Sequence, residues 1–194
     1  MIPLVSLVLA ATACGPRYRA PQLAPPGESG HESVVMRFFL EAESGRQKGR
    51  LVMDVDGRRG RVLFLNPLNR VVMDLHLDRG EAVLVNRRRQ RYWRGSFRSL
   101  TWRMWRLRLE FSDLRAWLFE PGGAPASRLK EGVEVEVERD AETGLPRRLV
   151  IHDGAALLRL SVLHRRRVAG SLVKARSLQT MRVADLEDVI ARDD

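Results

Sequence analysis

The sequence is poor in the residues that carry most protein chemistry. It has one cysteine, which excludes an internal disulfide, and four histidines without metal-ligand spacing. It also lacks a nucleophile elbow, a phosphate-binding loop and a glycine-rich dinucleotide fingerprint. We therefore expect a protein that is not an enzyme and that uses no metal or cofactor. The histidines are interpreted as surface strand residues: His31, His76, His152 and His164.

Long hydrophobic runs are also missing, apart from one at residues 1–14. This run is shorter than the roughly 20 residues of a membrane-spanning helix, and it ends in small residues as a secretory signal does. The cysteine, Cys14, follows Ala11-Thr12-Ala13, which resembles the bacterial lipobox. We predict a lipoprotein signal peptide at 1–14 and lipidation of Cys14; the alternative is an ordinary signal with an incidental cysteine. Gly15 stands where an aspartate retains enterobacterial lipoproteins in the inner membrane, so the outer membrane is favoured.

Acidic residues are outnumbered, and the formal net charge is +10. A basic surface attracts anionic membranes, lipid A phosphates, acidic proteins or nucleic acid, and composition does not choose among them. Arginines cluster at 87–89, with Arg91 and Arg94, and at 165–167. We interpret these clusters as solvated strand ends or as docking sites for anionic headgroups or an acidic carrier. An exported, lipidated chain does not meet nucleic acid, so that partner is not expected.

Proline and glycine are concentrated early in the chain, and little apolar material accompanies them at 15–32. That composition predicts a flexible tether. A β domain is expected over 33–168, and a C-terminal extension over 169–194, in which Val183–Ile190 suits a short helix. With 194 residues, one domain and a sizeable core are expected.

Strict alternation of apolar and polar residues dominates 33–168 and predicts half-buried strands. The central stretch Arg61–Trp93 reads as three antiparallel strands, with a turn at Asn66-Pro67-Leu68-Asn69 and another at Arg79-Gly80. About eight strands carry one continuous apolar face, and a sheet of that length curls to bury it. The predicted fold is mainly β (α+β): an open, curved antiparallel half-barrel with a short helical lid.

The lid is expected from two aromatic-rich inserts. Residues 97–109 suit a helix, although 106–109 also alternate as a strand would, and Ser112 is placed to cap a short second helix that ends before Pro121. Four tryptophans and two phenylalanines crowd this region. They predict either a plain filled core or the lid and wall of an acyl-binding cavity, and the sequence does not separate the two.

Three motifs resemble the LolB family of outer-membrane lipoprotein acceptors, within the LolA/LolB fold. They are the Asn66-Pro67-Leu68 turn between apolar strands, the hairpin ending in Gln90-Arg91-Tyr92, and the helix 112–118. The resemblance runs from about Gly49 to Leu163. It implies a monomeric, lipid-anchored outer-membrane protein facing the periplasm. Such a protein takes acylated lipoproteins from a periplasmic LolA-like carrier and inserts them among outer-membrane lipids. The alternatives are a lipid-sensing or envelope-assembly lipoprotein with the same fold, or a structural envelope lipoprotein with a filled core.

The resemblance also implies site residues. An apolar residue at a loop tip is unusual, and Leu68, with Pro67, is expected to form a membrane-insertion loop. An acyl cavity would be lined by inward residues of the strands and inserts: Phe38, Leu40, Met53, Phe64, Met73, Leu75, Trp102, Trp105 and Trp117.

Overall fold

The computed structural model describes residues 17–18, 30–42, 45–121, 132–154, 156–170, 172 and 181–190. Ten strands and three helices are found in this part of the chain. The strands are β1 (Gly30–Ala42), β2 (Gly45–Asp56), β3 (Arg59–Leu65), β4 (Val71–Asp78), β5 (Glu81–Asn86), β6 (Arg91–Ser96), β7 (Val133–Arg139), β8 (Pro146–Asp153), β9 (Ala156–Ala169) and β10 (Arg182–Val183). The helices are α1 (Phe97–Trp105), α2 (Phe111–Phe119) and α3 (Leu186–Ile190). No helix among these residues is long and apolar enough to cross a membrane.

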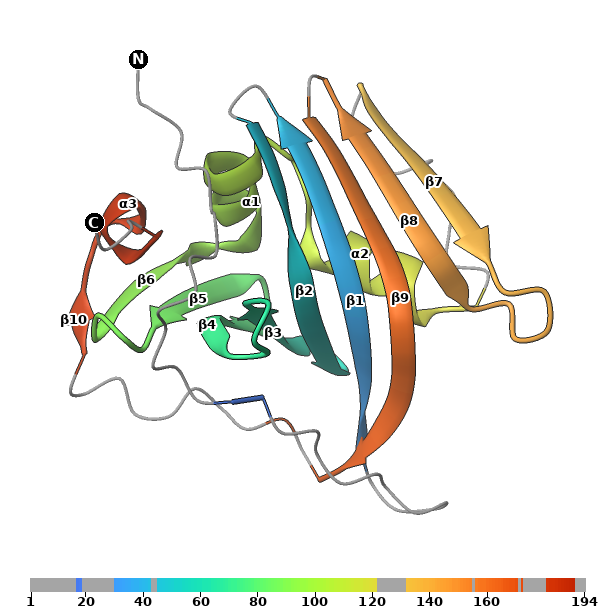
Figure 1. The fold of residues 1–194 in the computed structure, drawn as a ribbon, viewed down its shortest axis with the longest axis horizontal. Helices are drawn as coiled ribbons and strands as arrows, with labels where there is room; N and C mark the ends of the chain where they lie inside the picture. The colour runs from blue at the N-terminus through green and yellow to red at the C-terminus, as the bar shows by residue number, and fades with distance from the viewer. Residues whose placement is uncertain are drawn as a thin grey trace.

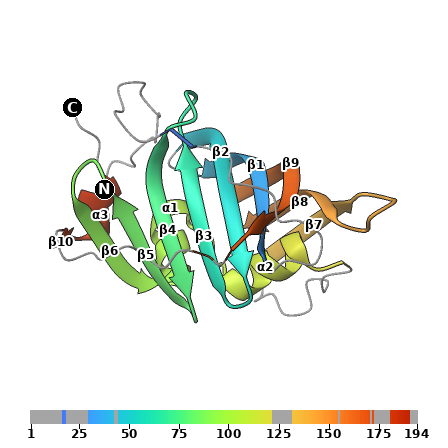
Figure 2. The ribbon, with the colours of Figure 1, turned by 90° about the horizontal axis from the view of Figure 1, so that it is seen from below.

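All the strands belong to one open sheet, in the order β10-β6-β5-β4-β3-β2-β1-β9-β8-β7. Neighbours are antiparallel except β10, which runs parallel to β6. The sheet bends strongly between β2 and β3, and α1 and α2 lie on its concave side (Figures 1 and 2). The predicted open half-barrel with a helical lid is confirmed, with two more strands than the expected eight.

One core fills the concave side. Inward residues of β1 to β6, β8 and β9 form a single apolar cluster with buried residues of α1 and α2. In β4, for example, Met73, Leu75 and Leu77 face this cluster, as their alternation predicts. Burial of this shared face is the main force that holds the helices against the sheet.

The predicted turns are present with the expected backbone. Asn69 adopts a left-handed conformation at φ 57°, as do Arg79 at φ 50° and Gly80 at φ 90°. Asparagine tolerates this region because its short polar side chain bonds locally. These turns set the register of β3 to β5, so the three antiparallel strands expected between Arg61 and Trp93 are confirmed.

The helix boundaries correct part of the sequence interpretation. Residues 97–105 are helical, capped by Ser96, whose Oγ accepts a 3.1 Å hydrogen bond from the Ser99 amide. Ser112 does not cap α2, because the helix already starts at Phe111, with Glu110 at the cap position. Phe111 is buried in the core, and its burial explains why the helix begins two residues earlier than a cap at Ser112 predicts.

The C-terminal helix also begins later than predicted. Arg182 and Val183 pair with Arg91 and Tyr92 as β10, so α3 covers only Leu186–Ile190. Among the histidines, His31 is buried rather than exposed, and its Nδ1 lies 3.0 Å from the carbonyl oxygen of Gly170. The histidine interpretation is therefore wrong at this position.

Candidate functional site

The loop between β3 and β4 is held rigidly around Asn66. The amide of Asn66 donates to the Arg70 carbonyl at 3.0 Å, and its own carbonyl accepts from the Asn69 amide at 2.9 Å. Its side-chain Oδ1 accepts from the amides of Leu68 at 3.0 Å and Arg70 at 2.9 Å. Asn66 is almost fully buried, so the loop is closed on itself and does not depend on its tip for stability.

The tip residues of this loop point outward. Leu68 is 55% exposed, one of three large apolar side chains on the surface of the described residues, with Trp102 and Val183. Pro67 is exposed as well. Leu68 thus lies outside the core, although burying a leucine is worth about 1.5–3 kcal/mol.

The N-terminal segment reaches the same loop. Arg17 forms an isolated β-bridge with Arg70, and the Tyr18 amide donates to the Asn69 carbonyl at 2.9 Å. The Tyr18 ring packs on a small apolar cluster of the outer sheet face, formed by Val52, Leu63 and Leu65. Residues 17–18, which belong to the segment predicted as a flexible tether, contact the β3–β4 loop and the outer face of the sheet. Cys14 falls outside the described residues.

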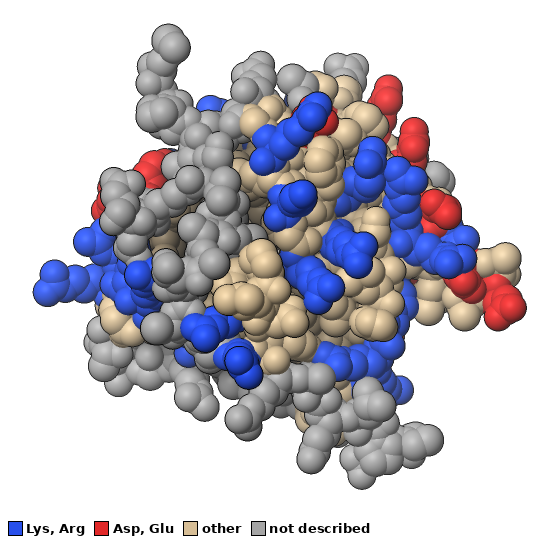
Figure 3. All heavy atoms as spheres, viewed as in Figure 1, with Lys and Arg blue, Asp and Glu red and all other residues tan. Residues whose placement is uncertain are grey.

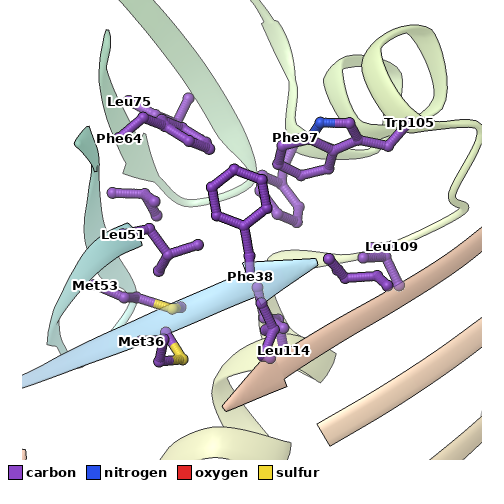
Figure 4. A pocket seen from close by; sticks show the side chains of 13 residues that line it. Met36, Phe38, Leu51, Met53, Phe64, Leu75, Phe97, Trp105, Leu109 and Leu114 are labelled. Carbon is purple, nitrogen blue, oxygen red and sulfur yellow. The ribbon is translucent and has the colours of Figure 1, made fainter. Parts of the chain in front are cut away.

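An apolar cavity lies between the sheet and the helices. It is small, about 30 Å³, whereas pockets that enclose small molecules measure about 300–1,000 Å³. Phe38, Phe64 and Trp105 stand together across it, with centroid distances of 6.4 Å for Phe38–Phe64 and 5.9 Å for Phe64–Trp105 (Figure 4). In this conformation the side chains nearly fill the space that an acyl chain would need.

The nine predicted lining residues differ in position: five border the cavity, three are buried beside it, and Trp102 is exposed. Phe38, Met53, Phe64, Leu75 and Trp105 surround the cavity. Leu40, Met73 and Trp117 are buried in the same core but do not border it.

Trp102 departs from the expectation, because it is 44% exposed and lies under the guanidinium of Arg106 at 5.5 Å. It follows Leu100 and Thr101, which occupy the buried face of α1, so the helical turn carries it to the solvent side.

Sequence reasoning missed other members of the lining. They come from strand positions of the same inward alternation, from α1 and α2, and from the segment between the two helices: Met36, Leu51, Val62, Phe97, Leu109, Leu114, Leu158 and Leu160. The alternation in β1, β2, β3 and β9 could have identified the strand residues. Leu114 shares the apolar face of α2 with Trp117, so the helical period could have identified it. Leu109 could not be found in this way, because its orientation depends on how the chain between α1 and α2 turns.

The outer face buries charge instead. Asp74 is fully buried; Arg61 donates to both of its oxygens at 2.8 Å, and Arg87 donates at 2.9 Å. His76 Nε2 lies 3.1 Å from Asp74 Oδ1. Burial alone would raise the pKa of Asp74, but the hydrogen bonds from Arg61 and His76 outweigh it and hold that pKa far below its usual value.

Most residues of the two arginine clusters have partners within the protein. Arg87 binds Asp74, Arg94 binds Glu81, and Arg91 lies 3.7 Å from Asp188. Arg165 faces inward after a register shift between β1 and β9, above the Phe119 ring at 5.9 Å, and burial lowers its pKa. These two clusters therefore contribute to the fold as well as to the surface charge.

Polar groups also border a second cavity of about 330 Å³ at the end of the half-barrel. It lies between the start of β1, the β2–β3 turn and the C-terminal end of α2. Arg115 borders this cavity, and its guanidinium donates to the Gly57 carbonyl at 3.1 Å and to the Glu120 carboxylate at 3.0 Å. No group of three His, Cys, Asp or Glu side chains in the described ranges could hold a metal ion.

The fold and the site together define a class: an open antiparallel half-barrel, lidded by two helices, with an apolar interior and an apolar loop tip on its rim. The family model described as outer membrane lipoprotein LolB matches residues 33–142, and the chain belongs to this family. It is therefore an outer-membrane lipoprotein of the lipoprotein localisation system, an acceptor and not an enzyme. The family is associated with lipoproteins and with LolA.

A solved structure is also similar, that of a LolA superfamily protein from Nitrosomonas europaea. It has 11% sequence identity and a TM-score of 0.45, and the match covers 78% of this chain and 90% of that one. No curated protein matches the sequence.

Proposed function

We propose that this protein takes acylated lipoproteins from a periplasmic LolA-like carrier into the space under α1 and α2, and inserts them in the outer membrane through the Leu68 loop. The observation that carries this proposal is the exposed Leu68, held out by a loop that is closed by hydrogen bonds to Asn66 Oδ1 and not by the Leu68 side chain. An exposed leucine is stabilised only when its side chain is transferred from water into an apolar environment, such as the interior of a membrane.

Transfer of an acyl chain needs no covalent chemistry, only an apolar space on both donor and acceptor. The inner face supports this role because its contacts are non-directional, so an acyl chain can replace them. The cavity of about 30 Å³ must widen to accept a chain. We expect the widening at α1 and α2, because most of their contact with the strands is apolar side-chain packing, with a hydrogen bond from Arg115 of α2 to the Gly57 carbonyl, whereas the strands are joined to each other by hydrogen bonds along their length.

A transfer assay with two matched variants tests the proposal. Leu68→Glu and Val183→Glu each place a charge at an exposed apolar position, and only Leu68 lies on the loop. Starting from a carrier–lipoprotein complex, we expect Leu68→Glu to stop delivery to outer-membrane vesicles and Val183→Glu to deliver as the wild type does. Normal delivery by Leu68→Glu would refute the role of the loop.

Anchoring through Cys14 is a second part of the proposal. Two or three acyl chains hold a protein on a membrane essentially permanently, whereas one binds marginally. Labelled palmitate is expected to enter the wild type and not Cys14→Ala, which should remain unprocessed or soluble. A wild type that takes up no label would overturn this assignment.

The small size of the cavity favours one alternative, a structural lipoprotein with a filled core. Uptake of a fluorescent fatty acid separates the two. Trp105→Ala should change saturable uptake because Trp105 borders the cavity, and Trp102→Ala is the matched control on the exposed side of α1. A protein that shows no saturable uptake at all would support the filled core.

A further inference from the structure

The outer face of β1 and β2 carries a basic patch, made of Arg37, Lys48 and Arg50, all exposed. Arg37 and Arg50 are direct cross-strand partners, and Lys48 lies opposite Phe39. Basic side chains are spread across this face, and acidic ones gather at the edge formed by β7 (Figures 1 and 3). Like charges placed directly opposite each other weaken a sheet, so the pair has no benefit for folding.

Two groups of ion pairs on the outer face lie beside this patch but do not include its residues. Glu41 pairs with Arg46 at the end of the β1–β2 hairpin, and Asp74 is enclosed by Arg61 and Arg87 on β4 and its neighbours. Among the described residues, no ion pair involves Arg37 or Lys48. The patch therefore presents positive charge to an outside partner.

The patch is continuous with the Leu68 loop. Arg50 donates a 3.3 Å hydrogen bond from Nη1 to Oδ1 of Asn69, the residue after Leu68. The loop projects toward the side on which the broad face of β1, β2 and β9 lies (Figure 2). The apolar tip and the basic patch therefore belong to one surface.

Arg17 lies beside the same loop. Arg17, which is exposed, bridges Arg70 beside the loop, and Cys14 is three residues earlier. Three residues of extended chain span at most about 11 Å. An acyl anchor on Cys14 would therefore hold the membrane surface within that reach of Arg17, next to Leu68.

From this arrangement we infer that the outer face of β1 and β2 is a docking surface for anionic phospholipid headgroups, with Arg37, Lys48 and Arg50 contacting lipid phosphates while Leu68 enters the apolar layer. The inference rests on the proposed membrane role of the loop and adds the class of lipid that the face recognises. It also sets the orientation of the half-barrel on the bilayer, with the β1–β2 outer face toward the headgroups.

Vesicle binding tests this inference. The mature chain from residue 14 with Cys14→Ser has no acyl anchor and keeps every described residue. It is compared on phosphatidylcholine vesicles and on equimolar phosphatidylcholine–phosphatidylglycerol vesicles. Each basic residue near an anionic surface changes binding about fivefold. The triple variant Arg37→Gln/Lys48→Gln/Arg50→Gln should therefore bind the anionic vesicles about a hundredfold more weakly, and the difference should disappear at high salt.

The matched control is Arg58→Gln/Arg103→Gln/Arg182→Gln, which removes the same charge from exposed positions elsewhere. It should retain anionic vesicle binding, and circular dichroism should show that both variants are folded. Equal losses in the two variants would mean that net charge alone acts, and unchanged binding by the first variant would overturn the inference. Leu68→Glu separates the two proposals, because it should weaken binding to both kinds of vesicle, whereas the basic patch should affect only the anionic kind.

Discussion

The two faces of the sheet are both buried in places, but by different interactions. On the inner face, buried side chains from β1 to β6, β8 and β9 pack with α1 and α2 in one apolar cluster, and directional bonds such as that between Arg108 and Asp153 lie outside this cluster. On the outer face, Asp74 is buried in a network of directional bonds with Arg61, Arg87 and His76. Apolar contacts can be exchanged for other apolar contacts, whereas a buried carboxylate needs its own partners. Under the proposed function, the apolar contacts of the inner face are the ones that an acyl chain would replace, and the ion network of the outer face would stay intact.

The largest effect is expected on the inner face. Phe64→Ala removes a buried ring that contacts Phe38 and Trp105, and should lower the free energy of unfolding by about 3–5 kcal/mol. Phe39→Ala is the matched change on the outer face, where the ring is half-buried, and should cost clearly less. Urea denaturation of both variants measures the difference; equal losses would mean that the two faces do not differ in this way.

The next effect concerns the outer-face ion network. Asp74→Asn leaves Arg61 and Arg87 without their charge partner. It should cost about 2–3 kcal/mol, less than the roughly 3–5 kcal/mol of a fully buried pair, because both arginines reach solvent.

The loss in Asp74→Asn should also depend on pH. The folded-state pKa of Asp74 is depressed, so its contribution is complete above the unfolded value of about 3.9 and disappears as the pH falls through the folded pKa. The difference in free energy of unfolding between the wild type and Asp74→Asn should therefore become smaller as the pH is lowered. A gap that is constant with pH would contradict the network's role.

A smaller effect is expected where α2 meets the sheet. A Cβ on Gly60 of β3 would collide with the ring of Phe111, at the start of α2. Gly60→Ala should therefore push α2 from the sheet at a cost of about 1–3 kcal/mol. Gly80→Ala cannot serve as a control for this collision, because Gly80 has φ 90°, and alanine would be strained there for a different reason. Hydrogen exchange should show faster exchange in α2 than in β1 and β9, and uniform exchange in the variant would mean that the lid does not move separately.

The smallest change in stability is expected at the loop tip. Leu68→Glu should shift the free energy of unfolding by no more than about 0.5 kcal/mol, since Leu68 makes no core contact and its amide bonds do not depend on the side chain. Thermal denaturation checks this. A melting temperature lowered by many degrees would show that Leu68 belongs to the core and would remove the contrast between the tip and the inner face.

The difference between the two faces also explains which features could be predicted from the sequence. The inner face was predictable because period-two alternation, as in Met73, Leu75 and Leu77, follows directly from strand geometry. The exposed Leu68 was predictable because Asn66 and Asn69 mark its turn. Trp102 was assigned to the wrong side, since the rotation of a short helix about its axis is set by packing against β5 and β6. The burial of Asp74 had no local signal, because Arg61 reaches it from β3 and Arg87 reaches it from the turn between β5 and β6.

A sheet that does not close leaves two edges that could pair with other chains. At one edge, β10 adds two residues to β6 and α3 covers the strands beside it. At the other, β7 alternates Glu134, Glu136 and Glu138, all exposed. Like charges would meet if two such strands came together. The sheet can therefore stay open, and its interior accessible to a ligand, while edge-to-edge pairing of β7 with a second copy is disfavoured.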